Sequence, residues 1–303
     1  MDGLVAAAPV DGAPAVSGVP FYKMTGSGND FVILDGRVSS PDQWPEPRVK
    51  AVCDRRNGVG ADGLVVLAPS ASDSVRMIYW NADGSRSAMC GNAALCCGRL
   101  AVRLGFVSEG EFCLLTDAGP VRVTSSKSGA VEINLPDFQL PSPFRAVAPD
   151  SGERWIALVT VGVPHLVVRV DDIEAVEPAV RGRWLRHHPA LGPAGANVNF
   201  VAHGAAPTDP WLIRTYERGV EDETLACGTG TVAAAAALAA RHEASLPVTF
   251  RSRGGPQLGV RGQVKSAAFS DAWLAGEGRL LFRGVWGEEG EALSAVATHP
   301  NPT

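Results

Sequence analysis

The 303-residue sequence has no long apolar run, no cluster of basic residues and no closely spaced metal-binding pair. Its longest apolar stretch, Val232 to Ala240, is less than half of the roughly 20 residues that a membrane-spanning helix needs. The formal net charge is −5 without any basic block, which argues against nucleic acid as a partner. Because no Cys-x-x-Cys or Cys-x-His pair occurs, a tetrahedral zinc site has no local nucleus, and we expect no metal.

The first twenty residues contain no Lys or Arg and no unbroken apolar core, both of which a secretory signal peptide needs. Their bias toward Ala, Pro, Gly and Val predicts a disordered leader over residues 1–19. A chain of this length does not need its six cysteines as disulfide staples, so we expect free thiols in a reducing compartment. The expected location is therefore the cytoplasm, without a membrane partner.

Lysine is scarce, and this scarcity limits the chemistry. Only four lysines occur, and no phosphate-binding motif accompanies them, which disfavours an enzyme that holds pyridoxal phosphate. The rest of the composition, 46% hydrophobic and 19% charged, is ordinary for a globular protein. The length is sufficient for two domains with cores of their own.

Short runs rich in β-branched residues, bounded by Gly, Asp and Ser, predict a strand-rich chain with few helices. Helices are predicted at about 45–56, 91–105 and 229–243, and the proline-rich segment 135–144 is interpreted as a linker. The predicted strands are 31–36, 63–69, 75–81, 112–119, 120–126, 130–135, 155–162, 165–170, 197–203, 211–217, 247–252 and 278–286.

The two halves of the chain resemble each other. TGSGNDFVILD at 25–35 matches TVGVPHLVVRVDD at 160–172, since both are a glycine turn followed by an apolar strand that ends in Asp. RMIYWNADGSRSAMCGN at 76–92 matches WLIRTYERGVEDETLACGT at 211–229, since both are a strand, an acidic loop and then Cys-Gly. Two matched pairs in the same order predict an internal duplication, with two related α/β domains.

Each half contains a cysteine that is predicted to begin a helix. Cys90 in MCGNAALCC and Cys227 in ACGTGTVAA both precede a glycine, a small polar residue and an alanine-rich stretch. At a helix N-terminus, the free N–H groups and the helix dipole stabilise a thiolate and bind a carboxylate. Each segment is therefore predicted to be a carboxylate cradle with a proton-transfer group beside it.

Two such thiols suit the inversion of a carbon stereocentre. If the halves face each other, one thiolate removes the α-proton of an amino acid while the opposite thiol returns a proton. Because the α-carbon is a weak acid, the site must be dry and must hold the carboxylate as negative charge develops. The remaining cysteines lack this context and are interpreted as small buried hydrophobes: Cys53, Cys96, Cys97 and Cys113.

At these residues the chain resembles the diaminopimelate epimerase family. The matching motifs are KMTGSGNDFVILD, CDRRNGVGADGL, NADGS with MCGN, GVPH, NVNF, and YERG with TLACGTG, in order over most of residues 21–286. The resemblance implies conversion of LL-diaminopimelate to the meso form for lysine and cell-wall synthesis, without metal or pyridoxal phosphate. It also implies a homodimer.

The fold that the resemblance implies is α/β (α+β), with two pseudo-symmetric halves. Each half is expected to be a mixed, mostly antiparallel sheet wrapped around a central helix. Residues 20–142 with about 275–288 would form the N-terminal domain, which carries Cys90, and residues 143–274 the C-terminal domain, which carries Cys227. Residues 289–303 would form a flexible tail.

The resemblance also assigns roles to residues of the candidate site. Cys90 and Cys227 would be the catalytic pair, and the reacting carboxylate would be held by Gly91, Asn92, Gly228 and Thr229. The rest of the substrate would be held by Asn29, Asn81, Asn197 and Arg218, with a bidentate grip of Arg218 on the distal carboxylate. His165 and Glu217 match positions beside the thiols, where they would contact the reacting amino group.

Departures from the family pattern leave alternatives open. Val163 stands where the family often has Asn at the distal end of the substrate, and Ala93 and Leu95 replace a usual Gly and Arg. The acidic loop 217–224 is also one residue longer than usual. One alternative is therefore a racemase of another amino acid with the same mechanism. Another is a non-catalytic amino-acid-binding module, for which Cys90→Ser would leave binding intact.

Oxidation is expected to inactivate the protein. Two thiols that face each other across a space for one α-carbon are close enough to form a disulfide when the site is empty. Activity is measured before and after a mild oxidant, and the Cys90–Cys227 bridge is sought by peptide mapping. Unchanged activity and no bridge would show that the thiols do not face each other.

Overall fold

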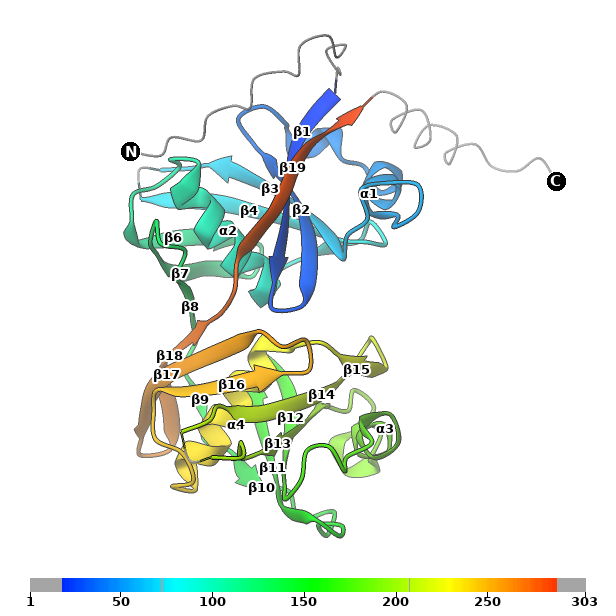
Figure 1. Ribbon diagram of the computed structural model, residues 1–303, viewed down its shortest axis with the longest axis vertical. Helices are drawn as coiled ribbons and strands as arrows, with labels where there is room; N and C mark the ends of the chain where they lie inside the picture. Colours follow the sequence, from blue (N-terminus) through cyan, green and yellow to red (C-terminus); the bar gives the residue numbers. More distant parts are fainter. Residues whose placement is uncertain (1–17, 72, 207, 288–303) are drawn as a thin grey trace, which may run out of the picture.

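The computed structural model describes residues 18–71, 73–206 and 208–287. These residues form two lobes, one above the other in Figure 1, and strand β1 begins at Gly18. Residues 1–17 of the predicted leader and the whole predicted tail, 289–303, lie outside the described residues. Gly18 and Val19 belong to the sheet and not to a leader, because they pair with Gly287 and Trp286.

The first lobe is a curved sheet that surrounds helix α2 (Gly91–Arg103). The helix packs against β1, β2, β3, β4, β7 and β8. The 3-10 turn η1 (Pro41–Gln43) and helix α1 (Glu46–Cys53) connect β2 to β3 in the sequence. The strands are β1 (Gly18–Gly26), β2 (Asn29–Asp35), β3 (Gly63–Pro69), β4 (Ser74–Asn81), β5 (Arg86–Ser87), β6 (Gly110–Thr116), β7 (Gly119–Ser125), β8 (Val131–Leu135) and β9 (Phe138–Gln139).

The second lobe repeats this plan around helix α4 (Gly228–Ala240). The short helical segments η2 (Pro178–Gly182), α3 (Arg183–Arg186) and η3 (Pro189–Leu191) take the place of η1 and α1. The strands are β10 (Ser142–Pro143), β11 (Glu153–Val161), β12 (Val163–Val170), β13 (Asn197–Ala202), β14 (Trp211–Glu217), β15 (Asp222–Thr224), β16 (Val248–Ser252), β17 (Gln257–Lys265) and β18 (Ala268–Ala275).

Strand pairing confirms the predicted duplication. In the first lobe β2 runs parallel to β3 and β4 parallel to β6, and in the second lobe β12 runs parallel to β13 and β14 parallel to β16. The other pairings of the described strands are antiparallel. The mixed, mostly antiparallel α/β fold with two related halves is therefore the one predicted.

Two equivalent strands join the lobes. β8 pairs antiparallel with β18, and in this ladder Ile133 lies opposite Leu274. The last strand, β19 (Arg279–Gly287), then returns to the first lobe and pairs with β1, just as β10 pairs with β11 (Figure 1). Because the lobes are related through this antiparallel pair, helices α2 and α4 face each other across the junction and are in contact.

Strands β2, β3, β12 and β13 are buried on both faces, which explains their nearly continuous apolar sequences. In β3, Val65 and Leu67 belong to the inner core around the helices, whereas Leu64 and Val66 face the outer core with α1. The inner core is one continuous cluster that includes both α2 and α4. Helix α4, which is apolar on all sides, suits this central position. No helix in the described ranges is long and apolar enough to cross a membrane.

Some elements differ from the sequence prediction. The patterns miss β1, β17 and β18, whose residues include Gly, Pro and charged side chains that strands usually disfavour. Helix α1 ends at Cys53 and not at 56, because the carboxylate of Asp54 accepts hydrogen bonds from the backbone N–H of Arg56 and Asn57. The proline-rich segment 135–144 is partly strand, since it contains β9 and β10.

Candidate active site

Cys90 and Cys227 occupy equivalent positions at the N-termini of the two central helices. Each is the N-cap residue, with φ and ψ of −140° and 123° for Cys90 and −129° and 110° for Cys227. This extended conformation turns the first N–H groups of each helix toward the cysteine sulfur. The backbone N–H groups of Asn92 and Ala93 hydrogen-bond to Cys90, and that of Gly230 hydrogen-bonds to Cys227.

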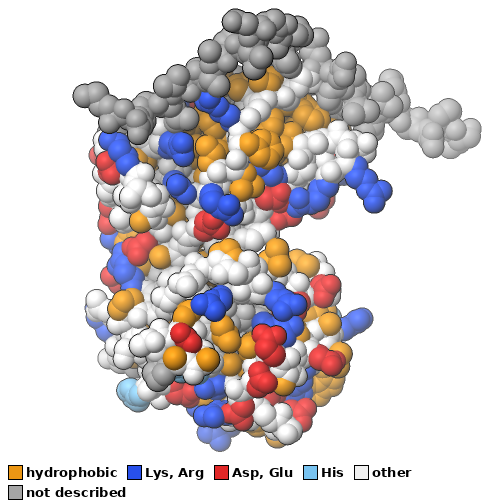
Figure 2. All heavy atoms as spheres, viewed as in Figure 1, with side chains coloured by type: hydrophobic (Ala, Val, Ile, Leu, Met, Phe, Trp, Pro, Cys, Tyr) orange, Lys and Arg blue, Asp and Glu red, His pale blue; other side chains and the backbone are white. Residues whose placement is uncertain are grey.

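The two helix N-termini meet between the lobes. A Cβ atom placed on Gly228 of α4 would lie 3.6 Å from the side-chain oxygen of Asn92 on α2. That oxygen is buried and has no hydrogen-bond partner among the described residues. The negative charge of a Cys90 thiolate also reaches Cys227, where it raises the pKa. The structure therefore brings the two predicted carboxylate cradles to one shared site, at the level of the notch between the lobes in Figure 2.

The pKa values of both thiols are raised, which favours the protonated form at neutral pH. Burial raises the pKa of Cys227 to about 12, and burial likewise raises the pKa of Cys90. The helix N–H groups act in the opposite direction, as predicted, but they do not outweigh the burial. The nearby carboxylate of Glu217 raises the pKa of both thiols further. The helix N-termini therefore stabilise the thiolates in the predicted direction, but burial has the larger effect on both pKa values.

In the first lobe, a chain of hydrogen bonds holds Asn92. Its Nδ2 donates to Oδ1 of Asn29 over 2.7 Å, and Nδ2 of Asn29 donates to Asp62 over 2.9 Å. Because Asp62 can only accept, the amide of Asn29 has a fixed orientation, and so does that of Asn92. The free oxygen of Asn92 consequently faces Gly228. Asn29 thus contacts Asn92 and orients its amide, and its predicted role in substrate binding stays a prediction.

Charged groups behind Asn29 hold this chain in place. The guanidinium of Arg55 forms ion pairs with the carboxylates of Asp30 and Asp62, each with an N–O distance of 2.7 Å. The ammonium nitrogen of the buried Lys23 lies 2.6 Å from a carboxylate oxygen of Asp30. Although burial raises the pKa of Asp30, hydrogen bonds from Arg55 and Lys23 lower it to about 2. Sequence reasoning missed these residues as site supports. The motif CDRRNGVGADGL contains Arg55 and Asp62, but it does not show which side chains they orient.

In the second lobe, His165, Asn197 and Arg218 lie together. His165 is opposite Asn197 in the β12–β13 ladder, and Oδ1 of Asn197 accepts a 2.8 Å hydrogen bond from the backbone N–H of Arg218. His165 is fully buried, and this burial together with the charge of Arg218 lowers its pKa to about 3. The half-buried guanidinium of Arg218 has no hydrogen bond or ion pair with any described residue, which leaves it available for an anion.

Three other predicted residues, Glu217, Asn81 and Thr229, differ in what they contact. Glu217 ends β14 and its pKa is raised by burial, and its charge acts on both thiols. Asn81 instead stabilises the turn after β4, where its Nδ2 donates to Oγ of Ser85 over 3.0 Å. Thr229 lies beside its thiol, with 3.7 Å between Oγ1 and Sγ of Cys227. Asn81 itself lies opposite Gly63 in the β3–β4 ladder.

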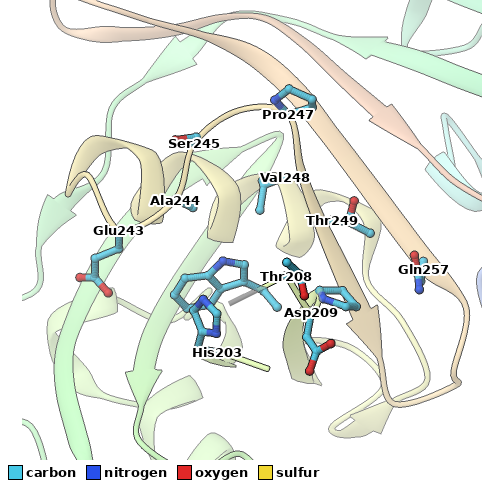
Figure 3. A pocket seen from close by; sticks show the side chains of 12 residues that line it. His203, Thr208, Asp209, Glu243, Ala244, Ser245, Pro247, Val248, Thr249 and Gln257 are labelled. Atoms are coloured by element: carbon cyan, nitrogen blue, oxygen red, sulfur yellow. The ribbon is translucent and has the colours of Figure 1, made fainter. Parts of the chain in front are cut away.

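A separate hollow of about 490 Å³ lies in the second lobe, where the chain leaves the C-terminus of α4 (Figure 3). His203, Trp211 and Glu243 are among the residues around it, and none of the predicted site residues lines it. Glu243 is already engaged, since it accepts a 2.6 Å hydrogen bond from the indole N–H of Trp155. This hollow is therefore distinct from the site of the two cysteines.

Comparisons with known proteins agree with this geometry. A family model described as diaminopimelate epimerase matches residues 21–138 and 157–263. A diaminopimelate epimerase of Gemmatimonas aurantiaca is 42% identical over 274 residues, which cover 87% of this chain and 98% of that protein. The chain belongs to the diaminopimelate epimerase family. A further member, from Chlorobaculum tepidum, is 36% identical over 271 residues, which cover 86% of this chain and 99% of the relative.

Solved structures outside the diaminopimelate epimerase family share the fold. A hydroxyproline epimerase from Agrobacterium vitis, with bound trans-4-hydroxy-L-proline, superposes with a TM-score of 0.59 at 19% identity over 91% of this chain and 94% of that one. A phenazine biosynthesis protein of the PhzF family from Bacillus anthracis gives a TM-score of 0.67 at 14% identity, over 88% and 98% of the two chains. At these identities the likeness concerns the fold alone.

The departures from the diaminopimelate epimerase pattern have defined places in the structure. Leu95 is fully buried, and a Cβ on Gly276 would lie 2.6 Å from its Cδ1, so Leu95 packs below the connection that leads to β19. Val163 begins β12 and is half-buried. Because side chains alternate along a strand, Val163 shares a face with His165. Val163 therefore lies on the face of β12 that carries His165, and the backbone N–H of Ala93 hydrogen-bonds to Cys90.

Alkylation of the empty protein should be slow at neutral pH and accelerate steadily as the pH rises. With a pKa of about 12, Cys227 is roughly one part in ten thousand thiolate at pH 8, and the thiolate is the form that attacks iodoacetamide and displaces its iodide. The rate of Cys227 alkylation, followed by mass spectrometry, should therefore rise about tenfold per pH unit between pH 7 and 9. A plateau within this range would show that the thiolate forms far more readily.

Proposed function

We propose that this chain is a cofactor-independent epimerase that converts LL-2,6-diaminopimelate to meso-diaminopimelate by proton transfer between Cys90 and Cys227. The observation that carries the proposal is the meeting of two thiol-bearing helix N-termini at Asn92 and Gly228. This arrangement supports a base and an acid on opposite sides of one carbon, and the family membership supports the substrate. The product serves lysine and cell-wall synthesis.

The proton balance of the reaction is simple. One cysteine, as thiolate, takes the α-proton from the substrate and becomes a thiol. The other cysteine, as thiol, gives its proton to the opposite face of the same carbon and becomes the thiolate. One C–H bond breaks and one forms, so the stereocentre inverts without net change of protons. The reverse reaction uses the same two groups with their roles exchanged.

The reacting carboxylate supplies negative charge that the two helix N-termini offset. The N–H groups at Gly91–Asn92 and Gly228–Thr229 belong to the first turns of α2 and α4, and such groups are suited to an anion. The positive α-ammonium group of the substrate would lower the pKa of both thiols, which burial and Glu217 raise in the empty site. Substrate binding and thiolate formation are therefore expected to be coupled.

Residues farther from the thiols fit the rest of the substrate. The unpaired guanidinium of Arg218 is suited to the distal carboxylate by two parallel hydrogen bonds. Asn197 supports Arg218 by accepting its backbone N–H. Asn29 acts on the other lobe, where it orients Asn92, and Asn81 holds the turn beside it.

The first test is proton NMR in D2O with LL-diaminopimelate, a reductant and no added cofactor. We expect loss of the α-proton signal together with appearance of the meso isomer, because the returned proton comes from solvent-exchanged thiol. If the α-proton of another amino acid from a panel exchanges, but that of LL-diaminopimelate does not, the proposed substrate is wrong and the proposed mechanism still stands. No exchange with any amino acid would favour a binding module.

Replacing either thiol tests the two-base assignment. Cys90→Ala and Cys227→Ala should each lower the epimerisation rate by at least about a hundredfold, the lower part of the range for a lost general acid or base. The matched control is Cys113→Ala, which removes a thiol from β6 and should keep the parent rate. Either active-site variant inverting as fast as the parent would overturn the assignment.

One observation favours a second candidate, a racemase of another amino acid with the same mechanism. Val163 lies on the face of β12 that also carries His165, and it cannot hydrogen-bond a polar distal group. An apolar side chain at this position would tolerate a substrate with a less polar end. The amino-acid panel in the NMR experiment separates this candidate from the first.

We also propose a cytoplasmic homodimer. Free cysteines at all six positions support a reducing compartment.

A second copy is supported by β19, which pairs with β1 alone among the described strands and exposes Leu281, Phe282 and Val285. Sedimentation equilibrium should give a dimer that Phe282→Glu weakens. A parent protein that is monomeric at micromolar concentration would contradict the dimer.

A further inference from the structure

His165 has one ring nitrogen with a partner and one without. Its Nδ1 lies 3.2 Å from Nδ2 of Asn199, and its Nε2 is buried with no hydrogen-bond partner in the described part of the chain. His165, Asn199 and Thr215 are each at most 3% exposed and belong to β12, β13 and β14. The three strands are neighbours, so these side chains form a polar row on the inner face of the second lobe.

The amide of Asn199 has only one orientation that satisfies its neighbours. It lies 3.0 Å from the backbone carbonyl of Leu166, which can only accept, so Nδ2 must face it. On the other side Oδ1 accepts a 3.0 Å hydrogen bond from the hydroxyl of Thr215. A flipped amide would place two oxygens against each other. The group that Asn199 presents to His165 is therefore an N–H donor.

This orientation decides which nitrogen of His165 carries the proton. Because Nδ1 faces a donor, it must offer its lone pair, and a neutral imidazole with a free lone pair on Nδ1 carries its hydrogen on Nε2. The burial of His165 and the charge of Arg218 oppose a second proton, which agrees with a pKa of about 3. The orphan Nε2 is consequently an N–H donor without a partner.

The first lobe has the same fold without an equivalent row of His, Asn and Thr. By strand register, the first lobe has Phe31, Val65 and Tyr79 where the second has His165, Asn199 and Thr215. Phe31 and Tyr79 form an apolar contact with 6.1 Å between ring centres. Since buried polar groups cost free energy that apolar ones do not, the row points to a role in the site.

The row also lies directly beside a proposed proton-transfer group. A Cβ on Gly230, in the first turn of α4, would collide with Oδ1 of Asn199 and lie 3.2 Å from Sγ of Cys227. Only a residue without a side chain lets the amide of Asn199 sit below the helix at this point. Asn199 is thus packed between the strand that carries His165 and the helix that carries the thiol.

We propose that Asn199 is a positioning residue that fixes His165 as its Nε2–H tautomer, so that His165 serves the site as a hydrogen-bond donor to an anion. The anion is a substrate carboxylate or a cysteine thiolate. On this account His165 neither accepts a proton nor binds the substrate ammonium group, in contrast to the contact expected from the sequence. The tautomer stands on the structure alone, and only the identity of the anion rests on the proposed function.

The tautomer is measured directly by long-range proton–nitrogen NMR of the full chain labelled with 15N-histidine. The sequence has six histidines, and His165→Gln identifies the resonances of His165. We expect a protonated Nε2 and an unprotonated Nδ1, unchanged between pH 6 and 8. A proton on Nδ1, or an imidazolium in this range, would overturn the proposal whatever the activity of the protein.

Asn199→Asp tests the positioning role with almost no change in shape. A carboxylate at 199 can only accept, so it should draw the proton to Nδ1 and invert the tautomer. Loss of the Nε2–H donor should lower the epimerisation rate about ten- to a hundredfold. Thr215→Val is the matched control, because it removes the partner of Oδ1 but leaves Leu166 to orient the amide, so the tautomer should persist. An unchanged tautomer in Asn199→Asp, or an inverted one with the parent rate, would contradict the proposal.

The anion is identified from the NMR shift of the Nε2–H proton of His165, measured in the parent protein and in a double variant that carries Cys90→Ala and Cys227→Ala. If the Nε2–H proton shifts when glutarate is added to the double variant, a carboxylate is the acceptor. If it shifts only in the parent when the pH rises far enough to ionise the thiols, a thiolate is the acceptor. No shift under either condition would overturn the donor role, even if Asn199→Asp failed to fold.

Discussion

The contact between the N-termini of α2 and α4 is the constraint on which the rest of the site depends. It follows from the antiparallel pairing of β8 with β18, because this pairing sets the two lobes so that equivalent helix ends face each other. A shift of this ladder by one residue would turn every side chain of these strands to the opposite face. The position of Gly228 against Asn92, and with it the shared space between the thiols, therefore rests on one strand pair.

The close packing of the two helix N-termini also opposes ionisation of the two thiols. Burial between the lobes raises the pKa of both thiols, and the carboxylate of Glu217 adds to this effect. The helix N–H groups offset only part of it. Under the proposed function, the ammonium and carboxylate groups of the substrate would supply the rest of the balance. The pKa shifts of the two thiols favour their neutral form.

The two halves place their cysteines on the same backbone structure, but the side chains around each cysteine differ. Each half supplies a cysteine at the start of a helix, but only the second places a buried histidine, asparagine and threonine beneath its helix. In the first half the corresponding support is a charged chain, in which Arg55 and Asp62 hold Asn29 against Asn92. The two thiols are therefore alike in backbone geometry and unlike in what surrounds them.

The sequence by itself determined the fold class, the duplication and the family, because repeated motifs such as Cys-Gly at a helix start carry local physical meaning. The roles assigned to the site residues stay predictions, and their arrangement came from the tertiary structure. Only strand register placed Asn199 beside His165, and only packing between the lobes raised the pKa of Cys227. Burial, amide orientation and tautomer depend on neighbours distant in sequence, so no local pattern contains them.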